Sequence, residues 1–136
     1  VGQGLGALKR LTNIELRFTD CNVGDAGVVA VGQGLGVLRS LTNVSLTFRY
    51  APGSETSLES EKVGDAGAMA VGHAIGASQS LTNVALYFEN CKVGDDGATA
   101  VGQGLGALKR LTNIELRFTD CNVGDAGVVA VGQGLG

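Results

Sequence analysis

Residues 11–36 of the chain read LTNIELRFTDCNVGDAGVVAVGQGLG, and this stretch decides the fold. Apolar and polar residues alternate from Ile14 to Phe18, as they do in a β-strand with one buried face. After a turn at Val23-Gly24-Asp25, the apolar positions step by four and then by three residues, which is the spacing of one helix face. The stretch therefore predicts a strand, a turn and a helix, with Asp25 at the N-cap of that helix.

The pattern recurs through the whole chain of 136 residues. Alignment on Val-Gly-x-x-(Leu/Ile)-Gly gives repeats at 1–30, 31–70, 71–100 and 101–130 and a partial repeat at 131–136, and only an insertion at 51–60 lengthens the second. The predicted capping aspartate recurs as Asp65, Asp95 and Asp125. Residues 1–36 and 101–136 are identical at every position, so three repeats make a larger period of 100 residues.

A single strand–turn–helix unit cannot bury its own apolar face, so neighbouring units must stack and extend the core in one dimension. Strands pair at about 4.8 Å, whereas helices need about 8–10 Å between axes. The stack should therefore bend with the strands on its inner face, and the glycines of the helices should reduce that bend. We expect a single α/β repeat domain over 1–136, without capping units, with parallel strands on one face and helices on the other.

The repeated motifs resemble those of a known family. The run Leu-Thr-Asn-(Ile/Val)-x-Leu-x-Phe, the turn (Asn/Lys)-Val-Gly-Asp-x-Gly and the helix end Gly-Leu-Gly-x-Leu are similar to leucine-rich repeats of the ribonuclease-inhibitor-like class, especially the glycine-rich repeats of about 30 residues in long protist proteins. Ser78 in place of a helix leucine and the insertion depart from the pattern. The resemblance implies a leucine-rich-repeat-like solenoid that binds partners or serves as a scaffold, without chemistry of its own.

Composition narrows the classes of partner. Hydrophobic residues make up 44% of the chain, and the formal net charge is −3. A binding face for nucleic acid needs an excess of basic residues, so we expect no nucleic-acid partner. No apolar run approaches the roughly 18 residues that span a bilayer, so we expect no membrane insertion. The compartment is open; we favour an extracellular or cell-surface location.

We expect no catalytic, cofactor-binding or metal-binding residue. His73 is the only histidine and takes a position that is Gln in the other repeats, which indicates a solvated helix position. Gly2-Gln-Gly4-Leu-Gly6 does not match a nucleotide-binding loop and falls inside a predicted helix. Asp95-Asp96 lacks the further oxygen ligands that calcium needs, and we interpret it as a capping aspartate beside a solvated one.

Two residue types recur at fixed positions of the unit. Cys21, Cys91 and Cys121 precede the turn, and they are either buried thiols or members of a disulfide between or within chains. An asparagine recurs at every strand entrance, where stacked amides should bond the backbone of the next unit; these residues are Asn13, Asn43, Asn83 and Asn113. Asn43-Val44-Ser45 also matches the N-glycosylation pattern.

Three surfaces are candidates for contact with a partner. Arg17, Tyr87 and Arg117 lie among the outward positions of the predicted strands. Hydroxyls at Ser54, Thr56, Ser57 and Ser60 make the insertion either a tolerated loop or a site of partner contact or modification. A strip of small residues should look outward from the helices: Val28, Gly32, Gly36, Ala68, Gly72, Gly76, Ala98, Gly102, Gly106, Val128 and Gly132.

Glycine costs about 1 kcal/mol against alanine in a helix, so this strip predicts close approach by another backbone. Side-by-side self-association of solenoids is one explanation, and tight helix spacing within one stack is the other. We expect a structural repeat protein, a segment of a long solenoid that self-associates end to end or side by side into a filament or fibre. The alternative is a protein-binding scaffold segment of a larger leucine-rich-repeat protein; a designed repeat protein or an enzyme fits less well.

Overall fold

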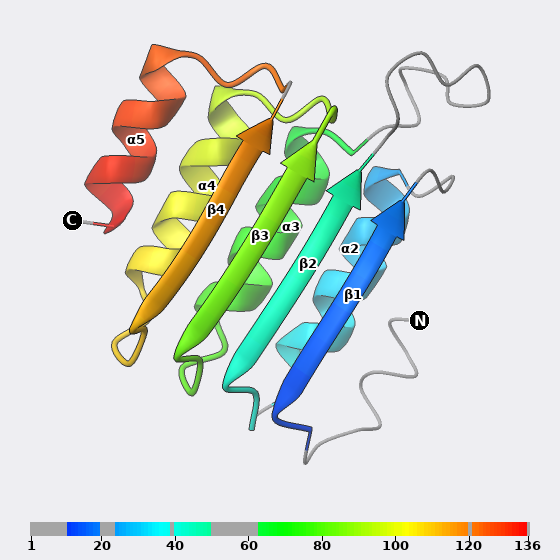
Figure 1. The fold of residues 1–136 in the computed structure, drawn as a ribbon, viewed down its shortest axis with the longest axis vertical. Helices are drawn as coiled ribbons and strands as arrows, with labels where there is room; N and C mark the ends of the chain where they lie inside the picture. The colour runs from blue at the N-terminus through cyan, green and yellow to red at the C-terminus, as the bar shows by residue number, and fades with distance from the viewer. Residues whose placement is uncertain (1–10, 20–23, 39, 50–62, 120, 136) are drawn as a thin grey trace.

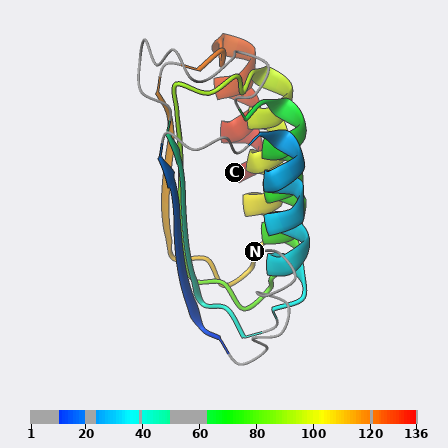
Figure 2. The ribbon, with the colours of Figure 1, turned by 90° about the vertical axis from the view of Figure 1, so that its right-hand side faces the viewer.

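The computed structural model describes residues 11–19, 24–38, 40–49, 63–119 and 121–135. Strands and helices alternate along the chain, as the sequence predicts (Figure 1). The strands are β1 (Asn13–Thr19), β2 (Asn43–Arg49), β3 (Asn83–Glu89) and β4 (Asn113–Thr119). The helices are α2 (Asp25–Gly36), α3 (Asp65–Gly76), α4 (Asp95–Gly106) and α5 (Asp125–Leu135). Figure 2 shows two layers, a sheet and a row of helices.

The sheet has the order β1-β2-β3-β4, and each neighbouring pair is parallel. Equivalent positions of the repeat lie opposite one another, so that Asn13 pairs with Asn43, Asn43 with Asn83, and Asn83 with Asn113. The helices pack in the same order on one side of the sheet (Figure 1). This arrangement is the predicted α/β solenoid, in which each unit contacts its sequence neighbours.

The core lies between the two layers. Inward strand positions form rows of like residues, and the Val44, Leu46 and Phe48 side chains of β2 are at most 4% exposed. Four phenylalanines stack in one such row, with successive ring centroids 5.4–5.5 Å apart; they are Phe18, Phe48, Phe88 and Phe118. A repeat with an exact register places identical side chains side by side, so a core poor in aromatic residues still contains a continuous aromatic stack.

The glycines of the helices permit contact between neighbouring helix backbones. A Cβ added to Gly72 of α3 would lie 2.6 Å from the carbonyl oxygen of Ala100 in α4, and a Cβ on Gly102 would lie 2.8 Å from Cα of Val131 in α5. Real Cβ atoms essentially never approach other atoms this closely. Glycine at these positions therefore serves close helix packing within the stack, which was the second of the two explanations for the small-residue strip.

The expectation that this strip looks outward is wrong for most of its members. Val28, Ala68 and Ala98 have no exposed surface, and the glycines that follow them by four residues are buried too: Gly32, Gly72 and Gly102. Gly36 and Gly76 are half-buried. Gly106, Val128 and Gly132 are exposed. The strip adjoins the core face of each helix on the side toward the next helix, and that helix covers it.

The prediction that Asp25 caps its own helix is also wrong, because the carboxylate caps the helix of the following unit. The N-cap residue of α2 is Gly24, and it makes no side-chain cap bond. Asp25 Oδ1 instead accepts hydrogen bonds from the backbone N–H groups of Gly64 (2.8 Å) and Gly67 (2.9 Å) at the start of α3. These amides are among those that a helix leaves without an internal partner.

The same cap between units recurs farther along the stack. Asp65 accepts from Gly94 and Gly97, and Asp95 accepts from Gly124 and Gly127, at distances of 2.7–3.0 Å. The second glycine of each pair leaves room for the capping carboxylate, since a Cβ on Gly97 would lie 2.7 Å from Asp65 Oδ1 and would displace it. The Asp of the motif Val-Gly-Asp-x-Gly therefore caps the helix of the following unit. The last Gly of the motif leaves room for the carboxylate of the preceding unit.

Several predicted features fall on residues outside the described part of the chain. These are the hydroxyls of the insertion (Ser54, Thr56, Ser57 and Ser60), Cys21 and the run Gly2-Gln-Gly4-Leu-Gly6. They stay predictions.

Candidate functional site

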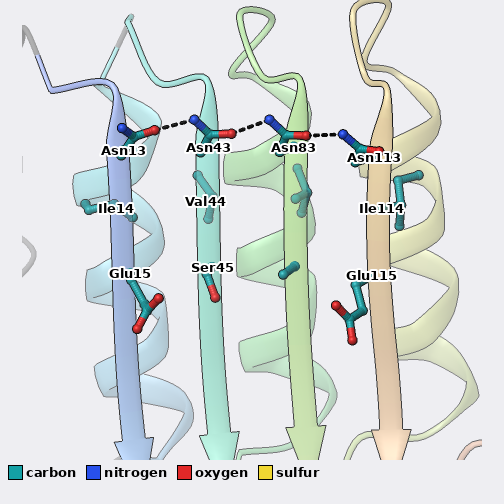
Figure 3. Close-up of a pocket in the computed structure, with 12 residues that line it drawn as sticks. Asn13, Ile14, Glu15, Asn43, Val44, Ser45, Asn83, Asn113, Ile114 and Glu115 are labelled. Atoms are coloured by element: carbon teal, nitrogen blue, oxygen red, sulfur yellow. Dashed lines mark hydrogen bonds between the residues drawn. The ribbon is translucent and has the colours of Figure 1, made fainter.

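The outer face of the sheet carries two kinds of row. One kind repeats the same residue in every unit, and the asparagine row at the strand entrances is an example (Figure 3). The other kind changes from unit to unit. The first variable row holds Glu15, Ser45, Ala85 and Glu115. The second variable row holds Arg17, Thr47, Tyr87 and Arg117.

The asparagines form the expected ladder, but with different partners. Asn43 Nδ2 donates to Asn13 Oδ1, Asn83 Nδ2 to Asn43 Oδ1, and Asn113 Nδ2 to Asn83 Oδ1. The bonds join side chain to side chain, whereas we had expected bonds to the backbone of the next unit. A parallel register at one strand position brings the amides together, so each can donate to one neighbour and accept from the other.

Asn43 is fully engaged in this ladder. Its Nδ2 group donates to Asn13 Oδ1 and, at 3.1 Å, to Thr42 Oγ1, which uses both of its hydrogens. A glycan is attached through this nitrogen and would replace one of the two donors. The structure thus gives the Asn43-Val44-Ser45 motif a structural role, and glycosylation at Asn43 stays an untested prediction.

A shallow groove of about 720 Å³ crosses the four strands between the asparagine row and the first variable row (Figure 3). Its residues come from the same three positions of each strand: Asn13, Ile14, Glu15, Asn43, Val44, Ser45, Asn83, Val84, Ala85, Asn113, Ile114 and Glu115. Small side chains at Ser45 and Ala85 lie in the middle, and Glu15 and Glu115 lie at the two ends. The groove is therefore open, with a lining of mixed polar and apolar character, and of a size that a short peptide segment fills.

Beside the groove, the strand-face residues predicted for partner contact lie in one row, as expected. Arg17 and Arg117 each pair with the glutamate two positions before it, at 3.1 Å and 2.8 Å. The Arg117 guanidinium also lies over the Tyr87 ring, 5.2 Å from its centroid. Exposed ion pairs of this kind contribute little to folding stability, about 0–1 kcal/mol. The fold does not depend on them, which leaves these side chains available for recognition.

The hydroxyl of Tyr87 has a raised pKa. A hydrogen bond to Glu115 is the main cause that raises the pKa of Tyr87 above 10.0, with smaller effects from partial desolvation and from the charge of the same carboxylate. Arg117 and Arg17 act in the opposite direction. Tyr87, Glu115 and Arg117 thus form one polar cluster at the end of the groove. Sequence analysis placed these residues in neighbouring strands but missed the contact between Tyr87 and Glu115.

His73 and the Asp95-Asp96 pair, which were first considered for chemistry, lie on different helices. His73 is exposed on α3, as predicted for a solvated position. Asp96 is exposed, and Asp95 caps the start of α5. Within the described ranges, no group of three or more His, Cys, Asp or Glu side chains comes close enough to hold a metal ion. In that same part of the chain, no helix has the length and apolar character needed to cross a membrane.

Cys91 and Cys121 follow β3 and β4. The Sγ atom of Cys91 donates to the carbonyl oxygen of Phe48 at 3.2 Å, and Cys121 Sγ donates to that of Phe88 at 3.1 Å. Cys91 is 5% exposed and Cys121 is half-buried. The burial of Cys91 agrees with a side chain that fills a small slot in the core, and the choice between a thiol and a disulfide stays a prediction.

The parallel sheet, the row of helices and the repeated motifs define the chain as a leucine-rich-repeat-like solenoid. The family model described as "Leucine Rich repeat" matches two of these units, at residues 11–32 and 111–132. The ribonuclease-inhibitor-like class within these repeats stays a prediction. No curated protein matches the sequence.

Among solved structures, the chain is similar to one described as "Leiomodin-1 Actin-Binding Site 2". The two share 14% sequence identity at a TM-score of 0.65, and the match covers 97% of this chain and 68% of the other. Identity at this level shows a common fold and nothing finer.

Proposed function

We propose that this chain is a segment of a protein-binding repeat scaffold, without catalytic activity, and that it recognises its partner through the open face of the sheet. The observation that carries the proposal is the groove across β1 to β4, bordered on one side by the first variable row, whose side chains the fold does not require. A rigid solenoid holds these side chains at fixed spacing. Binding then costs little conformational entropy in the backbone, which favours affinity.

The pattern of variation within the chain supports this surface. The rows that hold the solenoid together repeat the same residue in each unit, as at Asn13 and Asn43 or at Phe18 and Phe48. The outward rows change from charged to small to aromatic along the same four strands. A face that differs from unit to unit can distinguish one partner from another, whereas a uniform face cannot.

The structural comparison supports protein binding as a use of such a solenoid, since the similar solved structure is described as an actin-binding site. The proposal includes an extracellular or cell-surface location for this chain. Labelling of intact native cells with a membrane-impermeant amine reagent tests that location. Lys92 and Lys109 are exposed and would react.

Affinity capture from native cells, followed by mass spectrometry, tests the binding surface. The bait is the chain itself, beside a Ser45→Arg variant that fills the middle of the groove and an Ala66→Glu variant on the exposed side of α3. Ser45 is half-buried with its side chain on the outer face, and Ala66 is exposed, so both variants should fold. We expect one protein that the wild type and Ala66→Glu retain and Ser45→Arg loses. Equal retention by all three baits would refute recognition through the groove.

A second candidate function, assembly into a filament, rests on a different observation. Residues 101–136 repeat residues 1–36 at every position, and equivalent residues of neighbouring units lie in exact register, so further units can stack in the same way. The same surfaces would then recur at a constant spacing along a filament. Negative-stain electron microscopy with and without reductant tests this candidate: uniform fibres with an axial repeat of three units support it, and short separate particles contradict it.

A further inference from the structure

The exposed side of the helix layer carries almost no charge. The four helices contain no Lys, Arg or Glu, and their charged residues are aspartates in the first turn: Asp25, Asp65, Asp95, Asp96 and Asp125. The outward positions of α2 and α3 are instead Ala26, Val29, Ala30, Gln33, Ala66, Met69, Ala70 and His73. Solvent-exposed helix faces normally carry charged residues, so this face has the composition of a surface that another protein covers.

Exposed apolar side chains on this face also favour a surface that another protein covers. Met69 on α3 is 40% exposed, Val37 after α2 is 47% exposed, and Val129 on α5 is 58% exposed. Met69 is the only methionine of the chain. It is flexible and polarisable, which suits it to a contact surface.

A groove lies on the same face, and its lining includes Ala70, the residue after Met69. It has a volume of about 310 Å³ between α2 and α3, and its lining is Val29, Gly32, Gln33, Ala70, His73 and Ala74. Ala74 stands at the repeat position that is glycine in the other helices, Gly34, Gly104 and Gly134. A Cβ on Gly104 would overlap the backbone of Gly72. The methyl group of Ala74 therefore keeps α2 and α3 farther apart than α3 and α4, and the groove is the result.

We propose that the helix face of this solenoid pairs with the helix face of a second copy of the chain, with the two sets of helices antiparallel. This inference is independent of partner recognition through the strand face. A twofold axis across α3 would direct Met69 of each copy toward the α2–α3 groove of the other. Such an arrangement uses one patch twice, as isologous dimers do.

The charges at the two edges of the face favour a second copy of the chain in the antiparallel orientation. One edge carries the aspartates at the helix N-termini, where Asp96 and Asp125 are exposed and outnumber the one exposed basic residue described there, Lys92. The opposite edge carries Lys109 and Arg110, which are exposed in the loop after α4. An antiparallel copy places the acidic edge of one solenoid against the basic edge of the other. A parallel copy would place like charges together, which is unfavourable.

The area is sufficient for a stable pair. Each of α2 to α4 has 12 residues, a length of about 18 Å, and packed helices lie about 8–10 Å apart. Four helices thus present about 600 Å² per copy, or about 1,200 Å² for the pair, which reaches the lower bound for specific interfaces. A lipid surface fits less well, because interfacial helices carry Lys, Arg and bulky aromatic residues that this face lacks.

Sedimentation velocity of the 136-residue chain, over about 5–200 µM, tests the proposal. We expect a closed dimer in the wild type. The dissociation constant should be at least tenfold higher in the Gln33→Glu/Met69→Glu double variant, because four carboxylates would be buried in the pair. The matched control is Thr47→Glu, which adds a carboxylate to the strand face and should leave the dimer unchanged. Far-UV circular dichroism checks that each variant is folded.

A second variant leaves the helices untouched. Lys109→Glu/Arg110→Glu in the exposed loop should weaken the dimer about two- to fivefold at low salt, since acidic edges would then face each other. End-to-end stacking is distinguishable, because it gives an open series of sizes that Val128→Asp shortens, whereas the twofold pair stops at two. A wild type that stays monomeric throughout overturns the proposal, as does a dimer that neither helix-side variant weakens. Wild-type chain that is monomeric in solution yet co-sediments with neutral phosphatidylcholine vesicles would assign the face to lipid and overturn it too.

Discussion

Gly102 lies at the contact between α4 and α5, where the structure leaves no room for a side chain. Its added Cβ would lie 2.8 Å from Cα of Val131 and 3.4 Å from the carbonyl oxygen of that residue. Both atoms belong to the backbone, so they cannot move aside as the end of a flexible side chain would. Gly102→Ala must therefore displace one helix from the other, and with it the contacts that the two helices share.

Gly132 provides a matched control within the same chain. Residues 100–105 and 130–135 have the same sequence, Ala-Val-Gly-Gln-Gly-Leu, so the local helix propensity is the same at both sites. A Cβ on Gly132 meets no atom within 4 Å. Alanine is a better helix former than glycine, so Gly132→Ala should stabilise the protein by about 0.5–1 kcal/mol. Insertion of a methyl group into a packed contact costs about 1–3 kcal/mol, so Gly102→Ala should destabilise it by up to about 2 kcal/mol.

Urea unfolding followed by circular dichroism at 222 nm measures the difference. We expect the two variants to shift the unfolding midpoint in opposite directions and to differ by about 1–3 kcal/mol in the free energy of unfolding. Gly104→Ala should be at least as destabilising as Gly102→Ala, since its Cβ would overlap the Gly72 carbonyl oxygen. If Gly102→Ala stabilises as much as Gly132→Ala, the helix backbones do not touch, and the explanation of the glycines as close-packing positions is wrong.

Two further predictions concern the cap between units and the tyrosine of the strand face. Asp65→Ala leaves two backbone amides at the start of α4 without their acceptor, so it should lower the free energy of unfolding by about 1–2 kcal/mol. Asp125→Ala, at the equivalent site of the last described helix, should change this free energy little. Equal losses for the two variants in urea unfolding would contradict capping between units. The Tyr87 pKa is raised chiefly by its hydrogen bond to Glu115, so Tyr87 should stay protonated at pH values where a free tyrosine ionises, and Glu115→Gln should lower its pKa. Ultraviolet titration at 295 nm in a Tyr50→Phe background, which leaves Tyr87 as the only tyrosine, checks this, and an unchanged curve in Glu115→Gln would disprove the contact.

The sequence by itself determined the elements, their inward faces and their register. A period of two from Ile14 to Phe18 specifies which side of a strand is buried, and the change to steps of four and three specifies a helix. Because every unit carries the same motif, equivalent residues must lie side by side once the units stack. The aromatic stack from Phe18 to Phe118 and the asparagine ladder follow from that register alone.

The outward residues of the candidate groove were also predictable, since they are the strand positions that alternate with the core. The groove itself was not. It depends on the size contrast between Ser45 or Ala85 and the glutamates at its ends, and on the hydrogen-bonded position of the asparagine row. The contact between Tyr87 and Glu115 likewise joins two strands and requires the actual conformations of both side chains.

Only the tertiary structure decided the role of the small residues and of the aspartates. Helical periodicity groups Val28, Gly32 and Gly36 on one side of a helix, but it does not say whether that side meets solvent or the next helix. The direction in which the units stack makes that choice, and here it buries most of the strip. Asp25 lies one residue inside its own helix, where its carboxylate cannot act as the N-cap; backbone contact between neighbouring helices brings the amides of Gly64 and Gly67 within its reach. These features depend on the distance between two units, and no pattern within one unit contains that distance.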